Sequence, residues 1–162
     1  MAFIRTDYAG GQAITDVSTT QQHPLGFRVR ALDQTYGEGE FVYVKGVASG
    51  AAALLAVYNP YTGVTALTAA RSKGLCGVMM AALVASTYGW LQVRGSAVVA
   101  VNGTVVAGAT VYLSAGSGKV DDAVVTGDVV YGANFATADA TPAANQAVVG
   151  LANPWAGDTD AA

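Results

Sequence analysis

The chain has 162 residues and few charges: charged side chains make up 12% of it, against roughly 25% in an average soluble domain. The net charge is −3, and the eight lysines and arginines are scattered, so the sequence lacks the basic cluster of a nucleic-acid-binding protein. A single cysteine, Cys76, excludes an internal disulfide and a zinc site built from cysteines. The apolar run at residues 77–85 is far shorter than the ~20 residues of a membrane-spanning helix, so we expect no membrane partner.

Hydrophobic residue types reach 52% of the chain, and many of them are alanine and valine. Charge is normally depleted where a protein surface meets another protein. We therefore expect a good part of this surface to contact other protein chains. The alternative is a weakly charged surface that faces water.

Residues 1–35 are predicted to form an extended N-terminal arm, because no helical or strand period persists there and glycine and proline interrupt it. We expect residues 1–22 to dock on a neighbouring protein chain and to order on binding. The alternative is a disordered tail in the isolated protein. The candidate contact residues of the arm are its apolar side chains, Phe3, Ile4, Tyr8 and Ile14.

Residues 36–156 are predicted to form a β-rich body, followed by a flexible acidic tail at 157–162. Alternating apolar and polar residues with turn signals between them predict an all-β fold, a small β-sandwich or barrel. The run 78–85 is interpreted as a buried strand because it is short and follows a glycine. The other expected strands are 41–46, 54–58, 64–67, 88–94, 97–101, 104–106, 111–113, 119–120, 129–135 and 146–149. Residues 59–63 (Asn-Pro-Tyr-Thr-Gly) are expected to form a turn before 64–67.

Two local patterns within the body are specific enough to test. Asn102-Gly103 predicts a two-residue type I′ turn that joins 97–101 to 104–106 as a hairpin. In the strand 88–94, Tyr88 and Trp90 share one face with Gln92 and Arg94. We expect Tyr88 and Trp90 to lie in the core or at a subunit interface, and the core is favoured for Trp90.

No catalytic grouping is evident in the sequence, so the chain is not expected to be an enzyme. Its single histidine, His23, is expected in an exposed loop, and Cys76 is expected to be a small buried side chain. The stretch around Lys119 lacks the first glycine and the Ser or Thr of a phosphate-binding loop, because Leu113 and Val120 occupy those positions. The scattered carboxylates follow no calcium-loop spacing. No catalytic, cofactor-binding or metal-binding residue is therefore predicted.

Segments 24–26, 37–49, 88–95, 105–113 and 141–147 are similar to those of small phage proteins that decorate heads, also called capsid cement proteins. Gly-Glu-Gly-Glu at 37–40 and Tyr-Gly-Trp at 88–90 are the most distinctive parts, and the similarity extends over about residues 24–155. The resemblance implies a non-enzymatic virion protein that binds the major capsid protein on the outer surface of the head. It also implies a homotrimer at three-fold and quasi-three-fold positions. It assigns no individual contact residue. The alternative is another β-rich virion component, such as a tail or head-fibre base protein.

Overall fold

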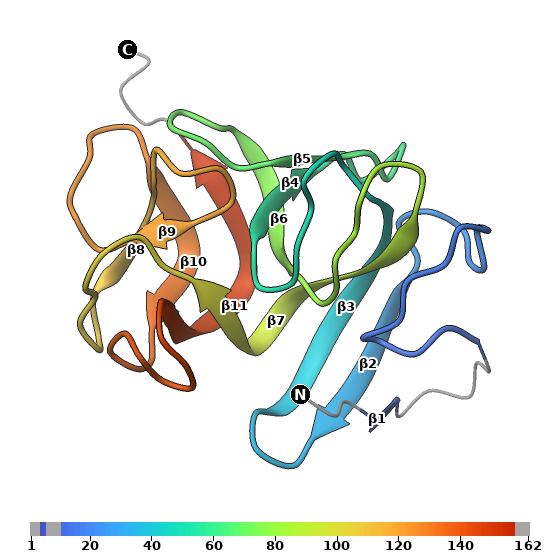
Figure 1. Cartoon of the computed structure of the whole chain (residues 1–162), viewed down its shortest axis with the longest axis horizontal. Helices are drawn as coiled ribbons and strands as arrows, with labels where there is room; N and C mark the ends of the chain where they lie inside the picture. Colours follow the sequence, from blue (N-terminus) through green and yellow to red (C-terminus); the bar gives the residue numbers. More distant parts are fainter. Residues whose placement is uncertain (1–3, 6–10, 158–162) are drawn as a thin grey trace.

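A computed structural model describes residues 4–5 and 11–157 of the chain (Figure 1). The described part contains no helix and eleven strands, which form an antiparallel sheet that is not closed into a barrel. This confirms the predicted all-β class and favours a small sandwich over a barrel. The strands are β1 (Ile4–Arg5), β2 (Arg28–Asp33), β3 (Gly37–Lys45), β4 (Leu55–Tyr58), β5 (Thr65–Leu67), β6 (Gly74–Met79), β7 (Tyr88–Ala100), β8 (Thr110–Leu113), β9 (Val120–Asp121), β10 (Val129–Phe135) and β11 (Gln146–Gly157).

Strand β7 is the centre of the sheet, whose order is β1-β2-β3-β7-β6-β11-β10-β8-β9 with β4 and β5 branching from β6. The first half of β7 pairs with β3 and β6, and its second half pairs with β11. The two halves meet at Gly95, which has a φ of 91° and contacts the carbonyl of Glu38 so closely that no side chain fits. The buried Gln92 amide donates hydrogen bonds to the carbonyls of Arg94 and Ser96, on either side of this bend.

Three clusters of buried side chains form the core, and β7 contributes to all of them. Trp90 belongs to an aromatic cluster with residues of β2 and β3. Leu91 belongs to a second cluster, in which β4 and β6 cover β3 and β7. Val99 belongs to the largest cluster, which extends to β8–β11. Valine and alanine fill much of the largest cluster, so the many small apolar residues of the sequence are used inside the molecule.

The segment before β2 lies on the chain's own sheet. Ile14 is 1% exposed within the aromatic cluster, and the Gln12 side-chain amide donates a 2.8 Å hydrogen bond to the Tyr88 carbonyl. Strand β2 then pairs with β3 along its whole length. The prediction that no strand precedes residue 35 is therefore wrong for 28–33. The signal was present, because Val29 and Ala31 are buried and alternate with exposed arginines.

The predicted Asn102-Gly103 hairpin is wrong. Positive φ is found at Gly103 and not at Asn102, whereas a type I′ turn needs it at both positions. Residues 104–106 form no strand, and Ala97–Ala100 of β7 pairs with β11 instead. That non-local pairing places Val99 beside Ala147 in the largest core cluster, where its apolar side chain is withdrawn from water.

The other expected strands correspond to β3–β11 with shifted bounds, and only the buried strand at 78–85 is substantially displaced: β6 begins at Gly74 and ends at Met79. The turn at 59–63 is confirmed, because the Asn59 side-chain carbonyl accepts hydrogen bonds from the backbone of Tyr61 and Thr62. The predicted tail at 157–162 lies outside the described residues except for Gly157, the last residue of β11.

Candidate functional site

The described residues contain no cluster of potential metal ligands. No group of three His, Cys, Asp or Glu side chains within them is placed to hold a metal ion. Cys76 is buried in the largest core cluster, as predicted, and its burial raises the pKa of the thiol to about 12. A thiol with this pKa is protonated at neutral pH and is a poor nucleophile.

His23 is not the exposed loop residue that we expected. It is partly buried, its ring stacks on Phe27 at 5.4 Å between centroids, and its edge faces Tyr43 at 5.1 Å. It also lies 5.4 Å from the Trp90 ring. His23 thus joins the N-terminal segment to the aromatic cluster, whereas Cys76 belongs to a different cluster.

The predicted contact residues fall into two groups. Phe3 and Tyr8 lie outside the described residues, and only the backbone of Ile4 is described, paired with Leu32 of β2. The structure brings the other three together in the aromatic cluster: Ile14 and Trp90 are fully buried, and Tyr88 packs partly buried against them. Ile14 and Trp90 therefore act as core residues, and neither reaches the surface of the chain.

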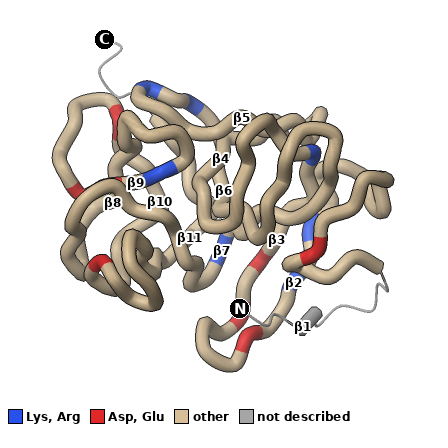
Figure 2. The backbone as a smooth tube through the Cα atoms, viewed as in Figure 1, with Lys and Arg blue, Asp and Glu red and all other residues tan. Residues whose placement is uncertain are grey.

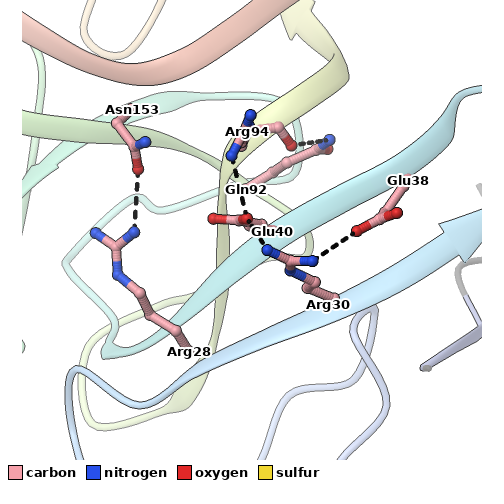
Figure 3. Close-up of polar contacts among 7 residues, drawn as sticks. All are labelled: Arg28, Arg30, Glu38, Glu40, Gln92, Arg94 and Asn153. Carbon is pink, nitrogen blue, oxygen red and sulfur yellow. Dashed lines mark hydrogen bonds and ion pairs between the residues drawn. The ribbon is translucent and has the colours of Figure 1, made fainter. Parts of the chain in front are cut away.

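Four charged side chains gather on one face of β2, β3 and β7, and we call them the charged row. Figure 3 shows contacts running from Glu38 through Arg30 and Glu40 to Arg94, with nitrogen–oxygen distances of 3.6, 3.2 and 3.4 Å. Elsewhere along the tube, blue and red segments are sparse (Figure 2). The row surrounds an open cavity of about 380 Å³ whose lining includes Gly39, Gly95 and Leu151.

Arg28 connects this face with the layer formed by β4 and β6. Its guanidinium donates one hydrogen bond to the Asn153 side chain at 3.0 Å and another to the Tyr58 hydroxyl at 3.1 Å (Figure 3). Burial raises the pKa of Tyr58, although the Arg28 charge opposes that effect, so the hydroxyl stays neutral at physiological pH.

An exposed apolar strip crosses β10, β11 and β6. Tyr131 and Trp155 are register partners with ring centroids 6.2 Å apart, and Leu75 is the register partner of Trp155 on the other side. Tyr131 is 40% exposed and Trp155 43% exposed. The strip continues at Leu75 into a shallow groove of about 630 Å³ lined also by Tyr58, Pro60 and Val64.

Sequence reasoning missed both the charged row and the apolar strip. A signal for the row was available, because Arg28 and Arg30 alternate with buried residues just as Glu38 and Glu40 alternate within 37–40. No comparable signal joined Tyr131 to Trp155, since their proximity depends on the pairing of β10 with β11.

Comparison with protein-family models, with curated proteins and with solved structures finds no match for this chain. Within the described residues, no helix has the length and apolar character needed to cross a membrane.

Proposed function

We propose that this chain is a structural capsid decoration protein, which binds the major capsid protein on the outer surface of an assembled phage head. The proposal includes a homotrimer at three-fold and quasi-three-fold positions and no enzymatic activity. It is supported by the sequence resemblance over about residues 24–155, by the all-β fold and by the low charge content.

The observation that carries the proposal is the apolar strip of Tyr131, Trp155 and Leu75. Tryptophan and tyrosine are enriched at protein interfaces, where few residues provide most of the binding energy. Here two of them are partly exposed on paired strands, so their backbone positions are fixed before binding. A surface of this kind suits a protein partner, and preorganisation lowers the entropy cost of association.

A decoration protein stabilises a shell by binding the assembled state in preference to its separated subunits. A trimer that contacts several capsid subunits also gains affinity through effective concentration, so each contact can be weak. This mechanism requires contact area and several binding sites, and it requires no acid, base or nucleophile.

Light scattering of the purified chain, followed by co-sedimentation with expanded, undecorated capsids of the same phage, tests the proposal. We expect a trimer that pellets with the shells and raises the temperature at which they disassemble. Wild-type protein that stays in the supernatant would contradict the decoration role and favour another virion component, such as a tail or head-fibre base protein.

A pair of variants tests the strip itself. Trp155→Ala should weaken capsid binding by roughly tenfold or more, the effect of losing an interface anchor. Val106→Ala is the control, because Val106 is 57% exposed between β7 and β8 and lines neither the strip nor the groove that continues it. Binding of Trp155→Ala as tight as that of the wild type would exclude the strip as the contact surface.

A further inference from the structure

We propose that the charged row is a self-complementary contact surface on which the same row of a second copy docks in the opposite direction. Glu38 then faces the partner's Arg94, and Arg94 faces the partner's Glu38. Such a contact is two-fold, so it differs from the proposed three-fold association and would join one trimer to the next. It deepens the proposed function, and its existence in solution does not depend on the capsid.

The order of charges in the row carries the inference. From Glu38 through Arg30 and Glu40 to Arg94, the signs alternate without interruption. When a second copy of this series is reversed, every position meets a charge of the opposite sign. A two-fold interface requires this kind of self-complementarity, because the same patch is used on both subunits.

The contacts within the row contribute little to the stability of a single chain. The side chains of Arg30, Glu38 and Arg94 are 62%, 57% and 59% exposed, and only Glu40, at 18%, is largely covered. Ion pairs with this exposure add little to the stability of a fold, because water screens the charges. Nevertheless, a chain with few charges places two of each sign here (Figure 3). Recognition explains this concentration of charge better than folding does.

The surroundings of the row suit a close protein contact. All four side chains extend from strands, so their spacing is fixed before association. Gly39 and Gly95 form part of the cavity lining between these side chains. Leu32, which is 48% exposed, is the register partner of Glu38 and supplies apolar surface at that end.

Charge balance argues for a second copy over a partner of one sign. The row carries two positive and two negative groups, so a uniformly acidic or basic partner would meet two like charges. Like charges brought together in an interface weaken binding and exclude the wrong partner. An identical row in reverse meets none.

The test uses two charge reversals, Glu38→Arg and Arg94→Glu, in the full chain. Each variant alone places like charges opposite one another at both ends of the contact. We expect each to weaken self-association by at least about tenfold in Kd, measured by sedimentation velocity over a concentration series at low salt. Lys119→Glu changes the net charge as Arg94→Glu does but lies outside the row, and it should associate like the wild type.

Mixing the two variants separates a direct contact from a structural effect. An equimolar mixture restores opposite charges at every position, so mixed complexes should form with roughly the wild-type Kd. Circular dichroism and thermal unfolding of each variant check that the fold is retained.

Three outcomes would overturn the self-contact: single variants that associate like the wild type, a mixture that stays dissociated, or wild-type protein whose trimers or single chains show no further association at any concentration. Failure of the wild type to pellet with capsids, with the variant mixture still associating, would overturn the decoration role alone.

Discussion

Trp90 and Trp155 are the two tryptophans of the chain, and they occupy opposite environments. Trp90 is 0% exposed, with its ring 4.9 Å from that of Tyr43 in an edge-to-face arrangement. Trp155 packs on one side against Tyr131 and leaves the other part of its ring on the surface. The same side chain therefore has a folding role at one position and is available for binding at the other.

This contrast predicts different costs for the same substitution. Trp90→Ala should lower the free energy of unfolding by about 3–5 kcal/mol, because it removes a fully buried side chain and leaves a cavity. Trp155→Ala should cost less than about 2 kcal/mol, since much of its surface is already in contact with water. Urea denaturation followed by the fluorescence of the remaining tryptophan measures both values, and equal losses would contradict the assignment.

Substitutions at Gly95 and Gly103 separate the energetic cost of a positive φ from the cost of steric overlap. Both have a φ of 91°, but a Cβ at Gly95 would overlap the Glu38 carbonyl, whereas a Cβ at Gly103 meets nothing within 4 Å. Gly103→Ala should therefore cost only the conformational penalty of about 1 kcal/mol. Gly95→Ala should cost clearly more, because β3 and β7 must separate at the bend. Thermal unfolding of the two variants gives the comparison, and a similar shift in both would argue against the close approach.

At the scale of elements, the N-terminal segment packs on the chain's own sheet, although its sequence pattern predicts an extended arm. Residues 11–22 contain no strand period, yet Ile14 fills the aromatic cluster. The Tyr43 hydroxyl donates a 2.8 Å hydrogen bond to the Gln12 side-chain carbonyl and accepts one from the Gln22 backbone. Burial raises the pKa of Tyr43, so this hydroxyl stays protonated and can donate at neutral pH.

Deleting residues 1–22 should consequently destabilise the body as well as alter any contact with a neighbour. The deletion removes the buried Ile14 and leaves the Tyr43 hydroxyl without its acceptor, a loss of at least about 3 kcal/mol. Ile14→Ala alone should reproduce roughly 2–4 kcal/mol of this loss. Urea denaturation provides the measurement, and a truncated chain as stable as the full one would show that the segment is a dispensable arm.

At the scale of the whole molecule, β7 contributes to all three core clusters, and β3, β4 and β6 each contribute to two of them. Trp90, Leu91 and Val99 lie in the three clusters along this one strand. Loss of any cluster removes pairing surface for β7 and so weakens the other two. The clusters are therefore coupled through β7 and through the strands that two of them share.

The chain should accordingly unfold in one cooperative transition. In a Trp155→Phe variant, tryptophan fluorescence reports on Trp90 and therefore on the aromatic cluster, whereas far-ultraviolet circular dichroism reports on all strands. Coincident denaturation curves from the two probes indicate two-state unfolding. An earlier fluorescence transition would show instead that β2, β3 and the N-terminal segment unfold as a separate unit.

The sequence by itself determined the all-β class, most of the strands and the turn at Asn59, because these depend on periods and side-chain preferences within a few residues. It did not determine which strands pair. The 97–101 segment had a local partner across Asn102-Gly103, but pairing with β11 places Val99 in the largest core cluster. The charged row and the apolar strip likewise exist only because β3 meets β7 and β10 meets β11. The pattern of residues within a segment decides whether that segment forms a strand. Burial of apolar surface, summed over the whole chain, decides which strands lie next to one another. The surface sites depend on these strand neighbours, so only the tertiary structure reveals them.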